Sequence, residues 1–357
     1  MFEHAQNLRV GIVGAAGYTG AELVRLAHRH PRLLITFVAA RERAGKLLGE
    51  ALPSTAGVPG VGDLVLETFE PERAPEVASR CDVVFTALPH AASARAGKAL
   101  LDAGCQVIDL SADYRLRDAG TYAAWYGEHP HPELCADAVY GLPELHRAEL
   151  EGARLIAAPG CYPTCSILAL APLLSAGLVE PSGIVIDAKS GVSGAGRSPG
   201  ASTHYPETAE GIRPYKIAGT HRHTPEIEQE LARAAGSEVR VVFTPHLVPM
   251  TRGLLATAYA RARAGTTADA CREAARAAYR DGLVTVLDGD RLPDTLHVRG
   301  SARAHVAYAL DARTGLVVAI GAIDNLARGA SAQAVQALNV SRGLPDALGL
   351  PEIALFP

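Results

Sequence analysis

This chain has few aromatic side chains and only a small net charge. Phe, Trp and Tyr make up 5% of its 357 residues, with a single tryptophan, and the formal net charge is −4. A protein that holds single-stranded nucleic acid needs aromatic rings for the bases and a basic surface for the phosphates. We therefore expect this protein to bind neither nucleic acid nor other polyanions in general.

Long apolar runs are missing as well. No stretch of the sequence reaches the roughly 20 apolar residues that cross a bilayer. The N-terminal residues Met-Phe-Glu-His-Ala-Gln-Asn lack the basic start and the apolar core of a signal peptide. We expect a cytoplasmic protein without a membrane segment.

The cysteine pattern argues against a zinc site and against a disulfide framework. The six cysteines contain no Cys-x-x-Cys pair and no spacing typical of a zinc site or of a disulfide framework. Histidine pairs at i and i+2 occur twice: His221/His223 has no set of Cys or carboxylate ligands nearby at the right spacing, and His129/His131 is interpreted as a surface turn. We expect reduced thiols and no bound metal.

The N-terminal half does contain an alternation of apolar strands and helices. Strands are indicated at 8–13, 33–40, 81–88 and 105–110, and helices after Gly20 and at about 90–103. Near-continuous apolar strands that alternate with helices are typical of a parallel sheet with helices on both faces. For residues 1–158 we therefore predict a Rossmann-type α/β domain.

Beyond residue 160 the pattern changes to longer strands that follow one another closely. They are indicated at 183–188, 238–243, 254–263, 283–287, 303–311 and 315–323, with helices at 268–279 and 326–340. Short connections between strands favour antiparallel pairing. For residues 159–325 we predict an α+β domain with a mostly antiparallel sheet.

A glycine-rich turn, Gly14-x-x-Gly17-x-x-Gly20, follows the first predicted strand and precedes a helix. Glycines at such a turn let the backbone approach a pyrophosphate, whose charge meets the helix N-terminus. The spacing departs from Gly-x-Gly-x-x-Gly, so the strand–turn–helix context carries the prediction of a dinucleotide cofactor.

The end of the second strand distinguishes two cofactors. An NAD site usually has an acidic residue there for the ribose 2′-hydroxyl, whereas this strand ends at Ala40 and continues Arg41-Glu42-Arg43-Ala44-Gly45-Lys46. Guanidinium groups suit a 2′-phosphate, so the sequence favours NADP over NAD. The alternative is a solvated charged loop, and Glu42 keeps that alternative open.

Cys161 lies in a turn, Pro-Gly-Cys-Tyr-Pro (159–163), ahead of a helix predicted from Thr164 to Ala176. Pro163 suits the first turn of a helix, where its missing N–H would have no partner. A thiol at that end faces the positive pole of the helix, which favours the nucleophilic thiolate. The alternative is a buried structural cysteine.

A second dense motif, Gly-Thr-His-Arg-His-Thr-Pro (219–225), leads into another predicted helix with Thr224 as its N-cap. An activated cysteine with a remote histidine as base, here His221, is a general nucleophile–base arrangement. Together with a nicotinamide cofactor, this pair predicts thiolate attack on an activated acyl group and hydride reduction of the resulting thioester to an aldehyde.

A set of segments distributed over most of the chain forms a specific combination of motifs. They are Gly-x-x-Gly-Tyr-Thr-Gly-Ala-Glu-Leu (14–23), Ala-Leu-Pro-His (87–90), Asp-Leu-Ser-Ala-Asp-Tyr-Arg (109–115), Tyr-Gly-Leu-Pro-Glu (140–144), Pro-Gly-Cys-Tyr-Pro-Thr (159–164), Lys-Ser-Gly-Val-Ser-Gly-Ala-Gly-Arg (189–197), His-Arg-His-x-Pro-Glu-Ile (221–227), Thr-Pro-His-Leu-Val-Pro-Met-Thr-Arg-Gly (244–253) and Asp-Asn-Leu-Ala-Arg-Gly (324–329). In these motifs the chain resembles the N-acetyl-γ-glutamyl-phosphate reductase family of arginine biosynthesis, within the wider aspartate-semialdehyde dehydrogenase-like group.

The resemblance implies roles for individual residues. Cys161 would be the nucleophile and His221 the acid/base, with His223 as its less favoured substitute. The substrate would contact Arg115, Ser190, His223 and Arg252, with the guanidinium fork of Arg115 near the phosphate. The cofactor would contact Gly14, Gly17, Tyr18, Thr19, Gly20, Arg41, Arg43, Pro89, Gly194 and Asn325, with Asn325 at the nicotinamide.

The resemblance also implies how the protein is assembled. The C-terminal segment 326–357 would return to the NADP-binding domain, and the protein would be a homo-oligomer, a dimer or a tetramer, built through the sheet of the second domain. In one respect the chain departs from the family, which usually has Ser or Thr where this chain has Ala40-Arg41. Which of Arg41, Arg43 and Lys46 contacts the 2′-phosphate therefore stays open.

The activity implied is NADPH-dependent reduction of N-acetyl-γ-glutamyl phosphate to the semialdehyde and phosphate. The α-aminoadipyl phosphate analogue of lysine biosynthesis differs by one methylene, which discriminates weakly; the motif at 189–193 favours the acetylglutamyl substrate. Two other classes stay open. An NADP-binding sensor without turnover needs no Cys/His pair, and a cysteine hydrolase needs no glycine turn.

Overall fold

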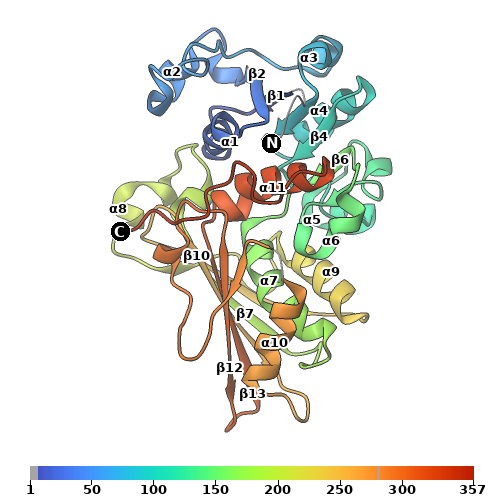
Figure 1. Cartoon of the computed structure of the whole chain (residues 1–357), viewed down its shortest axis with the longest axis vertical. Coiled ribbons are helices and arrows are strands. Elements are labelled where there is room, and N and C mark those ends of the chain that lie inside the picture. The colour runs from blue at the N-terminus through green and yellow to red at the C-terminus, as the bar shows by residue number, and fades with distance from the viewer. Residues whose placement is uncertain (1–6, 280–281) are drawn as a thin grey trace. The chain divides into compact units, whose positions relative to one another are not determined.

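A computed structural model describes residues 7–279 and 282–357, and it divides the chain into two compact units. The first unit comprises the chain up to Pro159 together with Ala330–Leu350, and the second comprises Gly160–Gly329 and Pro351–Pro357 (Figure 1). Residues 1–6, on which the expectation about a signal peptide depends, lie outside the described residues.

The first unit is built on a six-stranded parallel sheet with the strand order β2-β1-β3-β4-β6-β5. Its strands are β1 (Leu8–Val13), β2 (Leu33–Ala39), β3 (Val83–Thr86), β4 (Gln106–Asp109), β5 (Val139–Tyr140) and β6 (Leu155–Ala157). Every residue of β3, β4 and β6 is buried, as expected for strands covered on both faces. The predicted Rossmann-type domain is confirmed.

Helices cover this sheet. α1 (Tyr18–Arg29) packs against β1, β2 and α11 (Ala332–Ser341), while α4 (Ala92–Asp102) packs against β3, β4 and α3 (Ala74–Arg80). The remaining helices of this unit are α2 (Leu48–Ala51), α5 (Ala119–Tyr126) and α6 (Pro143–Leu150). The C-terminal helix thus belongs to the first unit, whereas the last seven residues, Pro351–Pro357, belong to the second.

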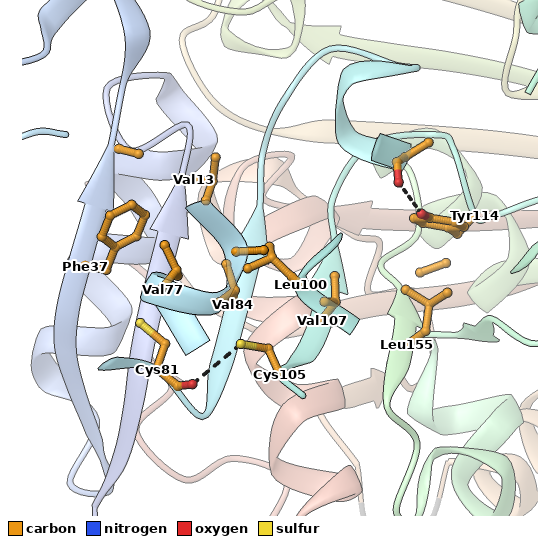
Figure 2. Packing of buried hydrophobic residues seen from close by; sticks show 14 of the residues in the cluster. Val13, Phe37, Val77, Cys81, Val84, Leu100, Cys105, Val107, Tyr114 and Leu155 are labelled. Atoms are coloured by element: carbon orange, nitrogen blue, oxygen red, sulfur yellow. Dashed lines mark hydrogen bonds between the residues drawn. The ribbon is translucent and has the colours of Figure 1, made fainter. Parts of the chain in front are cut away.

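One hydrophobic cluster of the first unit joins the sheet to α3 and α4. Figure 2 shows Phe37 and Val84 from the strands facing Val77 of α3 and Leu100 of α4, all of them buried. Tyr114 closes one side of the cluster, and its hydroxyl donates a hydrogen bond of 2.7 Å to the carbonyl of Ala94.

The second unit contains a seven-stranded mixed sheet with the order β11-β12-β13-β10-β7-β9-β8. Its strands are β7 (Ile184–Gly191), β8 (Arg213–Pro214), β9 (Val241–Val248), β10 (Leu254–Arg261), β11 (Val284–Val286), β12 (Ala304–Asp311) and β13 (Leu316–Ile323). Only the β7–β9 and β11–β12 pairs are parallel among the described strands of this sheet. The prediction of a mostly antiparallel sheet is confirmed.

Three helices lie on one face of this sheet (Figure 1): α7 (Cys161–Ser175), α9 (Thr224–Ala235) and α10 (Ala268–Ala278). A short helix, α8 (Tyr205–Thr208), belongs to the long segment between β7 and β9. α7 packs against β10 and β13, and all of its residues except Cys161 and Ser175 are buried. Among the helices of residues 7–279 and 282–357, none is both long and apolar enough to span a membrane.

Two helix starts differ from the sequence-based expectation. α7 begins at Cys161 rather than at Thr164, because Thr164 N–H already donates to the carbonyl of Gly160 and Pro163 needs no partner in the first turn. Thr224 is the first residue of α9 instead of its N-cap, and its buried hydroxyl has no hydrogen-bond partner. The observed helices thus begin three residues and one residue before the predicted starts.

Candidate active site

The glycine turn after β1 has the shape of a dinucleotide cradle. Gly14 has φ +98°, and a Cβ there would lie 2.3 Å from the carbonyl oxygen of Ala87; a Cβ on Gly20 would lie 2.2 Å from that of Gly14. α1 begins with Gly17 as an N-cap that offers no side-chain hydrogen bond, and its first turn carries no acidic residue. The first N–H groups of α1, with Tyr18 and Thr19, can therefore receive the pyrophosphate of a dinucleotide.

The loop after β3, which contains Pro89, meets this turn. Ala87 N–H donates to the carbonyl of Val13 at 2.8 Å, so the two loops are joined at the point where strand order reverses between β1 and β3. Ala91 ends the loop with φ +63°, which is uncommon for a residue other than glycine. The buried Asp113 carboxylate holds it there by accepting from the N–H groups of Ala91 (3.1 Å) and Ala94 (2.7 Å).

Basic residues follow the end of β2. Arg41 and Arg43 form a single 3-10 turn, and Arg41 makes an exposed ion pair with Glu70 at 3.1 Å. The carboxylate of Glu67, whose backbone pairs with Ala40, is engaged by two further arginine side chains. Arg41 and Arg43, which follow the strand, thus suit a 2′-phosphate, and the nearby carboxylate of Glu67 is already engaged in ion pairs.

Arg115 also lies in the first unit, where it is buried. Its Nε donates to the carbonyl of Ala158 at 2.8 Å and its Nη2 to that of Leu110 at 2.9 Å. These bonds fix the guanidinium beside the backbone three residues before Cys161 in the sequence. They also occupy two of its donor nitrogens.

Cys161 is the first residue of α7 and is partly exposed. The preceding Gly160 N–H donates to the buried carboxylate of Glu226 at 2.9 Å, which fixes the turn. On the other side lies Gly329, where a Cβ would be 2.7 Å from the Cβ of Cys161. Only a glycine at 329 therefore lets the Asp324–Gly329 segment pack on the thiol-bearing residue.

The other five cysteines are all buried, and burial raises the pKa of each thiol, to about 11 for Cys105, Cys135 and Cys271. Cys165 lies one turn after Cys161 on α7 and packs against Gly321. Cys105 donates to the carbonyl of Cys81 in the core of the first unit (Figure 2). Accessibility at a helix N-terminus therefore distinguishes Cys161 as the candidate nucleophile.

His221 is buried in the same unit, in contact with the residue next to Cys161. Its ring lies 5.6 Å from that of Tyr162, 5.3 Å from Phe243 and 5.4 Å from Tyr215, measured between centroids. Burial, reinforced by the positive charge of Lys216, lowers the pKa of His221 to about 4. The backbone N–H of His223 donates to Nδ1 at 3.1 Å, so the neutral ring carries its proton on Nε2.

Several of the predicted ligand residues form one cluster at the ends of β7 and β10. Asn325 accepts from Gly253 N–H at 2.8 Å and donates to the Ser193 hydroxyl at 2.9 Å. A Cβ on Gly194 would lie 3.2 Å from the Ser190 hydroxyl and 3.6 Å from the Asn325 amide nitrogen. Arg252 contacts the buried Asp324 at 3.5 Å.

The structure thus gathers the predicted site residues into two groups. The first unit holds Gly14, Gly17, Tyr18, Thr19, Gly20, Arg41, Arg43, Pro89 and Arg115, and the second holds Cys161, Ser190, Gly194, His221, His223, Arg252 and Asn325. Within residues 7–279 and 282–357, no group of three or more His, Cys, Asp or Glu side chains is arranged to hold a metal.

Several residues that shape these groups were not predicted from the sequence. Glu226 and Asp113 hold backbone N–H groups, Gly329 admits a close contact, and Tyr215 borders His221. All but Tyr215 lie inside the motifs quoted above, but their roles depend on contacts between segments distant in the sequence.

Two family models match the chain, one for each part. A model described as "Semialdehyde dehydrogenase, NAD binding domain" matches residues 9–153, and one described as "Semialdehyde dehydrogenase, dimerisation domain" matches residues 161–325. The first match agrees with the geometry of the glycine turn and indicates a nicotinamide cofactor.

Relatives of similar length are numerous. The chain is 50% identical over 352 residues to an N-acetyl-gamma-glutamyl-phosphate reductase of Geobacter sp. (strain M21), covering 98% of this chain and 100% of the relative. It is 48% identical over 351 residues to that of Geobacter sulfurreducens, with the same coverage.

Solved structures share the fold at lower identity. Aspartate semialdehyde dehydrogenase II of Vibrio cholerae, complexed with ASA, gives a TM-score of 0.71 at 18% identity and covers 94% of this chain and 98% of that one. Aspartate semialdehyde dehydrogenase with NADP from Candida albicans gives 0.68 at 18% identity, covering 96% and 100%. At such identity these structures establish the fold alone.

Proposed function

The chain belongs to the N-acetyl-γ-glutamyl-phosphate reductase family, and from this premise we propose that it reduces N-acetyl-γ-glutamyl phosphate with NADPH to the semialdehyde and phosphate in arginine biosynthesis. The observation that carries the proposal is the partly exposed Cys161 at the start of α7, with the neutral ring of His221 beside the adjacent Tyr162. The first unit would hold the cofactor, and the second would carry catalysis and assembly.

The chemistry begins with Cys161. The N-terminus of α7 stabilises its thiolate, which attacks the acyl carbon and displaces phosphate, so a C–S bond replaces a C–O bond. When bound, the nicotinamide supplies a hydride to the acyl carbon. The C–S bond then breaks, which returns the Cys161 thiolate and releases the aldehyde.

His221 would act as a neutral hydrogen-bond donor rather than as the base, since neither ring nitrogen has a lone pair free to take a proton. Because Nδ1 accepts from the His223 backbone, Nε2–H is the donor available to the acyl oxygen as negative charge builds on it. The lowered pKa of His221 keeps the ring neutral at physiological pH, so this donor costs no buried charge. Arg115, Ser190, His223 and Arg252 would orient the phosphate and the acylamino acid.

The cofactor would be NADP rather than NAD. Its pyrophosphate would lie on Gly14–Gly20 and the N-terminus of α1, its 2′-phosphate near Arg41 and Arg43, and its nicotinamide near Pro89, Gly194 and Asn325. The support is the absence of an acidic residue at the end of β2 and the ion-paired state of Glu67.

A homo-oligomer, a dimer or a tetramer, would form through the open face of the second unit's sheet. Tyr259, Val185, Val242 and Val318 are lateral neighbours on β10, β7, β9 and β13, and the first three are 38%, 37% and 56% exposed. A row of apolar side chains on an otherwise regular sheet face is typical of a protein interface. Light scattering of V242E should show a lower mass than wild type; an unchanged mass would exclude this face.

The thiols also support a cytoplasmic location, because six cysteines without a disulfide among them suit a reducing compartment. The activity is tested in the reverse direction, by following nicotinamide reduction with N-acetylglutamate semialdehyde and phosphate, with NADP and NAD in parallel. The aminoadipate semialdehyde analogue serves as the second substrate. Reduction of neither cofactor with either aldehyde would exclude the reductase and leave an NADP-binding sensor; cofactor-independent hydrolysis would indicate a hydrolase.

A further inference from the structure

Two tyrosine hydroxyls meet beside the candidate histidine. The hydroxyl of Tyr215 donates to that of Tyr162 at 3.2 Å, and the hydroxyl of Tyr162 donates to the carbonyl of His246 at 3.0 Å. This chain connects the loop after β8, the first turn of α7 and strand β9. Neither tyrosine has a role in the chemistry described above.

Both rings of this pair also border His221. Together with Phe243 they present three aromatic rings to the imidazole at centroid distances of 5.3 to 5.6 Å, all near perpendicular. Edge-to-face contacts at such distances favour one ring orientation over others. The imidazole is thus confined by rings on three separate elements, and the backbone of His223 fixes its tautomer.

The segment that carries Tyr215 does not hold its conformation by local preference. Lys216 and Ala218 have φ of +46° and +56°, in the left-handed region that residues with a Cβ rarely adopt. Such a segment persists only where contacts from outside hold it. Such contacts include the Tyr215–Tyr162 hydrogen bond and the bond of 3.1 Å from Tyr215 N–H to the carbonyl of Pro245.

We propose that Tyr162 and Tyr215 form a positioning pair that fixes the His221 ring beside the nucleophile and keeps water away from it. This inference rests on the proposed function for its catalytic meaning, but the state of the imidazole can be measured without turnover. The hydroxyl bond joins the loop to the residue next to Cys161, so movement of one changes the distance from the histidine to the acyl group.

The charged and titratable groups that face His221 are few. Lys216 and Tyr215 approach from the loop after β8, His223 from the histidine's own loop and Tyr162 from α7, while β9 contributes the apolar ring of Phe243. Burial raises the pKa of Tyr162 and raises that of Tyr215 to about 12, so both hydroxyls are neutral at physiological pH. The pair therefore acts through geometry and exclusion of water rather than through charge.

The test is Y215F, which keeps the ring and removes the hydroxyl bond. With histidines labelled with ¹³C and ¹⁵N, and with H221N to assign the signal, the pKa and tautomer of His221 are read by NMR in the full-length protein. We expect the pKa of His221 to rise by about one unit or more in Y215F, as water reaches the ring, with loss of the single Nε2–H tautomer. We expect kcat to fall about tenfold, with KM and NADPH affinity nearly unchanged.

Y279F is the matched control. Tyr279 donates a buried hydrogen bond of 2.9 Å to the carbonyl of Leu168 in the same unit, away from His221, so its loss costs stability in a similar way. If Y215F and Y279F lower the melting temperature alike but only Y215F changes the His221 signal and kcat, the pair is a positioning device.

A wild-type His221 titration and a kcat within twofold of wild type in Y215F would overturn the inference. Failure of the proposed function is a separate outcome, because it shows as an inactive wild type whose His221 signal still responds to Y215F.

Discussion

The N-termini of α1 and α7 are built alike and used differently. Each helix follows a parallel strand and has a glycine N-cap, Gly17 or Gly160, that offers no side-chain hydrogen bond. In the proposed function α1 offers its first N–H groups to an anion from outside the chain, and about half of its residues are buried. α7 carries its own candidate anion, the Cys161 thiolate, and is otherwise buried.

The N-terminus of a helix can stabilise different anions, and the packing around it decides which anion can reach it. Around α1, Gly14 and Gly20 remove side chains so that a ligand's phosphates can approach the backbone. Around α7, Gly329 removes a side chain so that the Asp324–Gly329 segment can reach Cys161. Substitutions at Cys161, at His221, at the glycines of the α1 turn and at Glu226 separate these two uses.

The largest expected effect is at the α7 end. In C161S, kcat should fall by about 10³-fold or more, because an unactivated hydroxyl replaces the thiolate. NADPH affinity, measured by fluorescence titration, should stay near that of wild type. C165S removes the buried thiol one turn later and is the control; comparable losses of kcat in the two variants would contradict the assignment of Cys161 as nucleophile.

The lowered pKa of His221 should make the free energy of unfolding depend on pH in the acidic range. Its pKa is about 4 in the folded protein against about 6.5 unfolded, so between these values the unfolded chain binds one more proton. Wild type should therefore lose about 3 kcal/mol of stability relative to H221N as the pH falls from 6.5 to 4. Calorimetric scans of both proteins over this range measure the difference, and parallel curves would show that the imidazole is not held neutral.

The α1 end should respond to glycine substitutions in two separable ways. In G20A the new Cβ would lie 2.2 Å from the Gly14 carbonyl oxygen, so the turn must shift, and both the melting temperature and NADPH affinity should fall, the affinity about tenfold or more. In G17A the nearest heavy atom is 3.6 Å away, so the melting temperature should hold. Loss of NADPH affinity in G17A without loss of stability would locate the pyrophosphate at this turn, and unchanged affinity would place it elsewhere.

The smallest effect is expected from substitution of Glu226, whose carboxylate accepts the hydrogen bond from Gly160 N–H before α7. E226Q keeps an acceptor for Gly160 N–H but loses the charge, which weakens the bond by roughly half, so kcat should fall by about threefold to tenfold. E226A leaves that N–H without its acceptor and should cost more. Stopped-flow measurement of phosphate release compares them; equal activity in all three proteins would show that Glu226 does not position Cys161.

The glycine turn, a helix shortly after Cys161 and the change from parallel to mostly antiparallel strands were all predicted from the sequence, because each is a local pattern. The extent of α7 was less readable, since its first turn is fixed by Glu226, 66 residues away from Gly160. Tyr215 was not readable at all. Nothing near it in the sequence signals a hydroxyl bond to Tyr162, 53 residues earlier.

The sequence by itself determined the elements and the chemistry they can carry: periodicity specifies strands and helices, glycine permits close approach, and a thiol at a helix start favours a thiolate. Only the tertiary structure decided which groups meet. It buried five cysteines and left Cys161 partly exposed, and it enclosed His221 in aromatic rings that keep the imidazole neutral. The physical reason is that accessibility and desolvation belong to the packed environment of a residue, which side chains distant in the sequence create.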